Sequence, residues 1–351
     1  MIEPGGSIFH EAVRGYVPGP GFLSLPGIER IRLFDGKTVH SPVEHLTGAR
    51  LIQAGHGMCT WSMPASPWFQ TQMGFFLNGV TALVADFALG GAILSALPAW
   101  TFPVTSDMNF TYLRPVRVDA GKLIARGKLI DLGRTQGTAE ALIEDGDGRI
   151  LAHATTRCFV RSIEPQDVVF EPSPEEQAGE GPDPFERPLP PDLAYDVSDL
   201  SHLSGLEIVR MIIGGDVPLS PWNLFTGVRL CEVGEGRMTA TFPASPWFQS
   251  PAGTIYGGLL AFVADSLTTG AATTTLAQGT ATASLDLKIH FLRPGTADGG
   301  LLTGTGEVVH GGKGLIVSRA EVVSADGKPL VVATGSFMRR QIRDWFAVVS
   351  A

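Results

Sequence analysis

The second half of the chain shows the clearest pattern of hydrophobic and polar positions. Residues 257–276 form a run rich in Leu, Ala, Val and Thr that contains one charged residue, Asp265. A segment of this length without a polar face predicts a helix that is buried on nearly all sides. Strand composition follows at residues 283–292, 300–310, 315–324 and 330–339. Gly, Pro and Asp residues separate these runs, which predicts a four-strand meander.

Two further elements are expected before the buried helix. Residues 206–212 carry apolar positions at helical spacing, with Asp199 or Ser201 as the expected N-cap and Gly214 at the stop. Residues 224–242 have the composition of strands. The order of helix, strand, long helix and meander predicts an α+β fold in which an antiparallel sheet wraps around the long helix.

The same pattern occurs twice along the chain. The hexapeptide ASPWFQ stands at residues 65–70 and again at 244–249, a shift of 179 positions. Within residues 65–86, 12 of 22 positions match their partners. This period is far longer than that of a solenoid repeat, which is about 20 to 50 residues, so it indicates a duplicated domain. The expected divisions are a first domain at 1–163, a linker at 164–199 and a second domain at 200–351.

Negative charge is concentrated in the predicted linker. Residues 164–199 contain 11 acidic residues, one basic residue and eight prolines, a net charge of −10. The whole chain carries −9, so the remainder is close to neutral and does not indicate a charged substrate. Proline density and charge repulsion predict that this linker is extended and poorly packed.

Several classes of protein are disfavoured by composition. The three cysteines, Cys59, Cys158 and Cys231, are scattered and unmatched between the copies, which argues against a disulfide framework or a metal site. No apolar run is long enough to span a bilayer, and residues 1–5 do not resemble a signal peptide. We therefore expect a cytoplasmic protein without membrane contact. The absence of a basic stripe argues against nucleic-acid binding, and the absence of GxSxG against a serine hydrolase.

Two aspartates are candidates for chemistry. Asp265 and Asp86 occupy equivalent positions in the two apolar segments, and each follows a glycine by seven residues, nearly two helical turns. Because a buried unpaired carboxylate is costly, each is either catalytic or a hydrogen-bonded packing residue. Residues 257–258 and 78–79 begin the two helices, where amides without intrahelical partners could hold a developing oxyanion.

The motifs around these residues resemble a known family. GTIYGGLLAFVAD (253–265) with SLDLKIHFLRP (284–294), and GFFLNGVTALVAD (74–86) with TSDMNFTYLRP (105–115), are similar to the phenylacetate-degradation branch of hotdog-fold acyl-CoA thioesterases. The resemblance implies two tandem hotdog domains. Because hotdog domains of this family act as dimers, it also implies an internal pseudo-dimer joined edge to edge.

The resemblance further implies composite sites, each taking its loop from one copy and its Asp from the other. Site one would consist of Tyr256, Gly257, Gly258, Asp86 and Thr105. Site two would consist of Asn78, Gly79, Asp265 and Ser284. Tyr256 and Leu77 stand where the family often has His. Because Leu77 leaves site two with one polar group fewer, we expect site one to be more active.

Additional positions are candidates for binding the substrate. Ser250 and Thr71 occupy a loop position where the family often has Asn, and Gln249 and Gln70 precede them. Lys313 and Arg134 lie at matching turns and could meet the nucleotide of CoA, or simply be solvated charges. Trp68 and Trp247 of the repeated hexapeptide are interpreted as packing anchors, and Arg114 and Arg293 as strand-end residues.

Three functions remain open at this point. The first is hydrolysis of an acyl-CoA or related thioester, with Asp86 or Asp265 as general base or nucleophile. It requires no cofactor, since CoA is part of the substrate. The second is non-catalytic binding of an acyl thioester, and the third a hotdog dehydratase or hydratase, for which no Asp–His pair is evident. The sequence does not reveal the acyl chain, or whether the carrier is CoA or acyl carrier protein. The expected solution species is one chain or a pair of chains.

Overall fold

The computed structural model describes residues 8–172, 181–190, 193, 200 and 202–341 of the 351-residue chain. The first copy contains α1 (Gly27–Arg32), α2 (Pro42–Thr47), β1 (Arg50–Gly55), β2 (Met58–Pro64), α3 (Val80–Leu94), β3 (Thr101–Tyr112), β4 (Lys122–Leu132), β5 (Gln136–Asp145) and β6 (Ile150–Ser162). The second contains α4 (Gly205–Gly214), α5 (Pro221–Thr226), β7 (Arg229–Gly234), β8 (Arg237–Pro243), α6 (Gly257–Thr273), β9 (Thr280–Phe291), β10 (Leu301–Gly311), β11 (Leu315–Val323) and β12 (Pro329–Gln341). The repeated order confirms the duplicated α+β domain.

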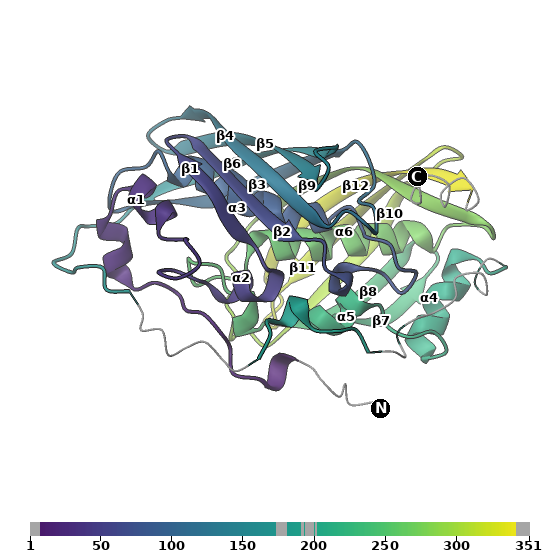
Figure 1. Cartoon of the computed structure of the whole chain (residues 1–351). Helices are drawn as coiled ribbons and strands as arrows, with labels where there is room; N and C mark the ends of the chain where they lie inside the picture. Colours follow the sequence, from purple (N-terminus) through teal and green to yellow (C-terminus); the bar gives the residue numbers. More distant parts are fainter. Residues whose placement is uncertain (1–7, 173–180, 191–192, 194–199, 201, 342–351) are drawn as a thin grey trace.

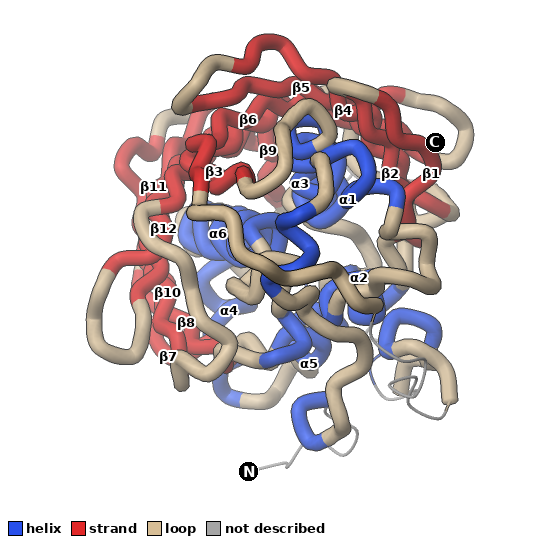
Figure 2. Tube along the Cα trace, turned by 90° about the vertical axis from the view of Figure 1, so that its left-hand side faces the viewer, coloured by secondary structure: helices blue, strands red, loops and turns tan. Residues whose placement is uncertain are grey.

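The two copies share one antiparallel sheet (Figure 1). Within the described ranges it has 12 strands in the order β1-β2-β4-β5-β6-β3-β9-β12-β11-β10-β8-β7. The order is symmetric about the pairing of β3 with β9, which runs from Asp107–His290 to Thr111–Asp286. The strands curve around α3 and α6, which lie side by side on the inner face (Figure 2). This arrangement confirms the internal pseudo-dimer joined edge to edge.

Glycines in the sheet let the central helices pack closely on it. Thirteen of the 15 residues of α3 are buried, as are 13 of the 17 of α6, so both helices need contact on nearly every side. A Cβ on Gly127 of β4 would lie 2.1 Å from the Ala88 carbonyl oxygen, and one on Gly306 of β10 2.2 Å from that of Leu267. These equivalent positions therefore require glycine. Although apolar, neither these helices nor others in the described ranges could span a membrane.

Helix α4 begins later than the sequence analysis expected. Its N-cap is Ser204, whose hydroxyl accepts a hydrogen bond from the Glu207 amide at 3.4 Å, while the Glu207 carboxylate accepts from the Ser204 amide at 2.7 Å. This reciprocal pair is a capping box, and it satisfies two backbone donors at the helix start. The expected caps, Asp199 and Ser201, lie outside the described residues.

Helix α5 was not anticipated, because it overlaps a segment with strand composition. Its Trp222 amide donates to the Gln70 carbonyl of the other copy at 3.3 Å. Equivalent helix α2 repeats the contact, since the Val43 amide donates to the Gln249 carbonyl at 3.3 Å. Each copy therefore supports the repeated hexapeptide loop of the other copy.

Residues 181–190 correct the expectation of a poorly packed linker. The carboxylate of Asp183 accepts hydrogen bonds from Arg14 at 3.1 Å and from Nδ1 of His45 at 2.9 Å. The Phe185 carbonyl accepts a hydrogen bond from the Ser66 hydroxyl at 2.7 Å. Net charge and proline content did not predict this packing, because it depends on individual polar pairs formed against the first copy.

Candidate functional site

Asp86 of α3 reaches across to the start of α6. Its Oδ2 accepts a hydrogen bond from the Gly258 amide at 2.8 Å. In the part of the chain that the structure describes, its Oδ1 has no hydrogen-bond partner, and the residue is 9% exposed. A Cβ on Gly257 would lie 2.8 Å from Oδ2, so glycine is needed for this approach. The carboxylate is therefore held at one oxygen and open at the other.

Asp265 of α6 makes the equivalent contact in the opposite direction. Its Oδ2 accepts a hydrogen bond from the Gly79 amide at 3.0 Å. Its Oδ1 lies 3.5 Å from the Tyr112 hydroxyl, and the residue is 0% exposed. The two carboxylates are thus related by the pseudo-symmetry but differ in access, because both oxygens of Asp265 face protein donors.

The amides at the start of α6 have different partners. The Tyr256 amide donates to the Phe248 carbonyl at 2.8 Å, and the Gly258 amide donates to Asp86. Across the described residues, the Gly257 amide has no acceptor. Of the backbone amides expected to hold an oxyanion at site one, only that of Gly257 is therefore without an acceptor among the described residues. It lies next to the Gly258 amide that contacts Asp86. In the first copy the amide of Asn78, equivalent to Gly257, likewise has no acceptor among described groups.

Burial changes the acidity of both aspartates. It raises the pKa of Asp86 to about 6, and the hydrogen bond from Gly258 offsets part of the rise. It raises the pKa of Asp265 to about 7, against the opposing effects of the Gly79 amide and the Tyr112 hydroxyl. A carboxylate with a pKa near 6 is mostly ionised at neutral pH yet more basic than a solvated one, which suits a general base.

The comparisons with known proteins identify this architecture. The family model described as "Thioesterase superfamily" matches residues 73–152 and 252–331, once in each copy. Both copies are thioesterase-superfamily domains. The tesB protein MAP1729c of Mycobacterium avium subsp. paratuberculosis is 15% identical, with a TM-score of 0.52, and the match covers 83% of this chain and 95% of that one. The acyl-CoA thioesterase II TesB2 of Mycobacterium marinum is 12% identical, with a TM-score of 0.51, covering 85% and 98%. A comparison with curated proteins finds no significant match.

The strands of the thioesterase domains bring Thr105 and Ser284 to equivalent places. Thr105 of β3 pairs with Cys158 of β6, and the Cys158 thiol lies 3.8 Å from the Thr105 hydroxyl. The charge of Asp86 contributes to a raised pKa of the Cys158 thiol, about 12, after the larger effect of burial. In the second domain Ser284 pairs with Phe337. Thr105 therefore belongs to the surroundings of Asp86 through Cys158.

The loop residues of the two domains are packed rather than open. Gln70 is buried, and Gln249 is partly buried. The Ser250 hydroxyl accepts from the Ala252 amide at 3.2 Å, which ties it to its own loop. Thr71 is 9% exposed, and its hydroxyl has no partner among the described residues. Their predicted contact with substrate remains a prediction.

The remaining positions separate into exposed cations and packing residues. Lys313 and Arg134 are exposed in the turns that follow β10 and β4, and their role toward CoA remains a prediction. Trp247 is buried, and its indole donates to the Ile8 carbonyl at 2.9 Å, while the Trp68 indole donates to the Arg187 carbonyl at 2.8 Å. Arg114 and Arg293 donate to the carbonyls of Ile150 and Pro329, at 2.7 and 2.9 Å. These contacts support the structural roles expected from the sequence.

Two aromatic positions were missed by the sequence analysis. Tyr112 and Phe291 each directly precede the Leu-Arg-Pro motif of their copy. Tyr112 lies at site two and Phe291 at site one, so each lies at the site whose loop comes from its own copy. The Phe291 ring lies 3.5 Å from where a Cβ of Gly257 would stand. Their aromatic character at a matched position was the available signal. Site one thus has an apolar wall where site two has a hydroxyl.

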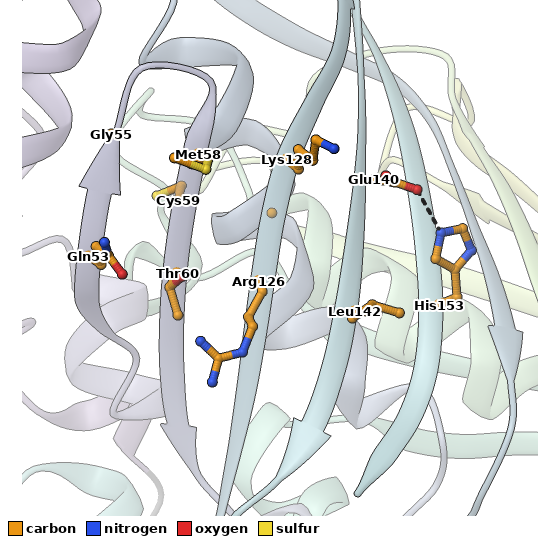
Figure 3. Close-up of a pocket in the computed structure, with 11 residues that line it drawn as sticks. Gln53, Gly55, Met58, Cys59, Thr60, Arg126, Lys128, Glu140, Leu142 and His153 are labelled. Atoms are coloured by element: carbon orange, nitrogen blue, oxygen red, sulfur yellow. Dashed lines mark hydrogen bonds and ion pairs between the residues drawn. The ribbon is translucent and has the colours of Figure 1, made fainter. Parts of the chain in front are cut away.

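A separate groove lies on the outer face of the first domain, away from both aspartates. It is lined by residues of β1, β2 and β4 to β6, including Arg126, Lys128 and Leu142 (Figure 3). At one side of it, Nε2 of His153 lies 3.2 Å from a carboxylate oxygen of Glu140. None of the predicted site residues lines this groove, so it is not part of the candidate active site.

The raised pKa values predict how stability depends on pH. Because both pKa values in the folded chain, about 6 and about 7, exceed the ordinary aspartate pKa of 3.8, the folded chain binds these protons more tightly than the unfolded chain. The resulting stabilisation is present below about pH 4 and is lost as the pH rises through 6 and 7. Relative to wild type, the Asp86→Asn/Asp265→Asn variant should therefore gain roughly 6 kcal/mol of unfolding free energy between pH 4 and pH 8, because a pKa difference of one unit corresponds to about 1.4 kcal/mol. Urea denaturation of both proteins at each pH measures this difference; a constant difference would contradict it.

Proposed function

We propose that the chain hydrolyses an acyl thioester at site one. The observation that carries the proposal is the carboxylate of Asp86, which has one oxygen held by the Gly258 amide and the other without a partner among the described residues. The unpaired Gly257 amide stands beside it at the start of α6. A base and an oxyanion donor on opposite sides of one interface are the two groups that acyl transfer to water requires.

The reaction follows from this arrangement. Asp86 accepts a proton from water as the water oxygen bonds to the thioester carbonyl carbon. The carbonyl oxygen becomes an oxyanion that accepts a hydrogen bond from the Gly257 amide. The carbon–sulfur bond then breaks, the sulfur leaves with the proton returned by Asp86, and the products are a carboxylic acid and a thiol. Direct attack by the Asp86 carboxylate, followed by hydrolysis of the anhydride, uses the same groups.

Differences in access favour site one over site two. Asp265 is 0% exposed and both its oxygens face donors, whereas Asp86 is 9% exposed with one oxygen open. Site two therefore has no oxygen ready to receive a proton from water. We propose that site two mainly stabilises the interface between the domains.

Thiol release from a panel of thioesters tests the function. The panel contains aliphatic and aromatic acyl-CoAs. Thioesters of acyl carrier protein form a second set. We expect turnover of at least one member by wild type, and none by the Asp86→Asn/Asp265→Asn variant. Turnover retained by that variant would contradict the assignment of the aspartates.

Non-catalytic binding of a thioester is the second candidate function. Two observations favour it. The Gly258 amide, one of the expected oxyanion donors, is occupied by Asp86. Asp265, one of the two expected bases, is completely buried. Calorimetric titration with the same acyl-CoAs distinguishes the two. Binding without turnover of any panel member would support this second function.

A further inference from the structure

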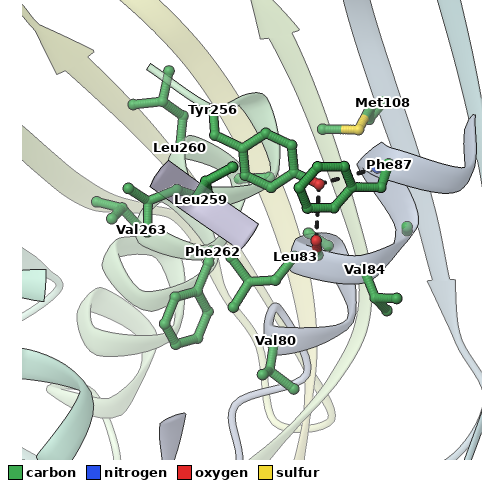
Figure 4. Packing of buried hydrophobic residues seen from close by; sticks show 14 of the residues in the cluster. Val80, Leu83, Val84, Phe87, Met108, Tyr256, Leu259, Leu260, Phe262 and Val263 are labelled. Carbon is green, nitrogen blue, oxygen red and sulfur yellow. Dashed lines mark hydrogen bonds between the residues drawn. The ribbon is translucent and has the colours of Figure 1, made fainter. Parts of the chain in front are cut away.

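The hydroxyl of Tyr256 enters the backbone of the opposite central helix. It donates a hydrogen bond to the Leu83 carbonyl at 2.8 Å and accepts one from the Phe87 amide at 3.0 Å (Figure 4). In an uninterrupted α-helix, the amide of each residue bonds the carbonyl four positions earlier, so Leu83 and Phe87 form such a pair. The hydroxyl therefore bridges two groups that a regular helix joins directly, at the turn that carries Asp86. Side chains inserted in this way change the local course of a helix.

Aromatic packing holds the tyrosine in this position. Its ring lies 4.5 Å from that of Phe87, and the Phe87 ring stacks on Trp61, also at 4.5 Å. Tyr256 is 4% exposed, and burial, together with the charge of Asp86, raises the pKa of its hydroxyl well above 10. The hydroxyl thus stays protonated and acts as both donor and acceptor, which uses its hydrogen-bonding capacity within α3.

The equivalent position in the other copy has no such bridge. Leu77 replaces Tyr256, and the equivalents of Leu83 and Phe87 in α6 are Phe262 and Ser266. Within the described chain, no side chain of the first copy bonds these two backbone groups of α6. The bridge accompanies only the aspartate that has an open oxygen.

We propose that Tyr256 is a positioning residue for Asp86. One short segment contacts α3 at two points: the Tyr256 hydroxyl at the backbone and the Gly258 amide at the carboxylate. The close fit leaves little freedom, since a Cβ on Gly258 would lie 2.6 Å from both the Ala82 carbonyl oxygen and the Tyr256 ring. The first contact sets the helix turn, and the second then holds Oδ2 and leaves Oδ1 open. The kinetic consequence rests on the proposed hydrolysis; the structural one does not.

Tyr256→Phe removes one oxygen and tests the proposal. We expect kcat to fall roughly 10- to 100-fold, because the displaced Asp86 carboxylate is no longer aligned for catalysis. KM should stay within about threefold of the wild-type value, because the contacts that bind the substrate are unchanged. We also expect the acidic limb of the kcat profile to move to higher pH, because the Gly258 amide that lowers the pKa of Asp86 is less well aligned. The matched control is Tyr16→Phe, at a residue that is not part of site one. It removes a hydroxyl that donates to the Thr38 carbonyl at 2.5 Å.

The test distinguishes a failure of the positioning role from a failure of the proposed function. Unchanged kcat and an unmoved acidic limb would overturn the positioning role, and so would a loss confined to KM. NMR titration of the Asp86 carboxyl, assigned with Asp86→Asn, gives a readout without turnover. If no thioester is hydrolysed, an Asp86 pKa higher in Tyr256→Phe than in wild type and Tyr16→Phe still supports positioning. An identical pKa in all three proteins overturns it.

Discussion

Replacing Asp86 by asparagine is expected to lower kcat by about 10²- to 10⁴-fold while the chain remains folded, because general-base catalysis contributes about that much. The amide of asparagine keeps the shape of the side chain and can still accept the hydrogen bond from Gly258, but it cannot take a proton from water. Steady-state thiol release on the best member of the thioester panel measures the change. Circular dichroism and the melting temperature report whether the fold is retained.

Asp265→Asn is the matched control for this prediction, because it makes the same chemical change at the pseudo-symmetric position. Its effect on kcat should be smaller, since Asp265 is fully buried with both oxygens facing donors. A larger loss in Asp265→Asn than in Asp86→Asn would reverse the ranking of the two sites. Wild-type turnover in both variants would show that the carboxylates are structural.

Replacing Gly127 by alanine is expected to lower the free energy of unfolding by about 3 kcal/mol or more. The added methyl group would stand 2.1 Å from the Ala88 carbonyl oxygen, so β4 and α3 must move apart. Gly306→Ala should behave in the same way in the second domain, where the distance is 2.2 Å. Urea denaturation at fixed pH measures the loss in each variant.

Gly90→Ala provides the control for these substitutions. Gly90 lies within α3, and a Cβ added there meets nothing within 4 Å. Because alanine favours helix over glycine by about 1 kcal/mol, this variant should be as stable as wild type or more stable. If Gly127→Ala unfolded at the wild-type urea concentration, the close helix–strand contact would not be a requirement of the fold.

Much of the architecture was predictable because it depends on repeated local patterns. The apolar run that contains Asp265 and the alternation of strands and turns predict the central helix and the meander. The contact between Asp86 and Gly258 was implied by the family resemblance, since no local pattern joins residues 172 positions apart. The capping box of α4 could also have been found, because Ser204 and Glu207 have its spacing, but Asp199 or Ser201 was predicted as the cap instead.

Other features depend on single contacts that patterns do not encode. The sequence places Tyr256 at the site, but its hydroxyl bonds the backbone of α3, which only the packing of the two helices reveals. Asp183 appeared as one of many linker charges, yet it pairs with Arg14 and His45. The greater access of Asp86 than of Asp265 likewise arises from neighbours contributed by both copies.

The pairing of β3 with β9 within one chain has a consequence for how the site is maintained. In a dimer of separate chains, dilution separates the loop from the aspartate that it contacts, because association depends on protein concentration. Here the two halves are covalently joined, so each remains at a high effective concentration near the other. Assembly of the Asp86–Gly258 contact is therefore a folding equilibrium, independent of how much protein is present.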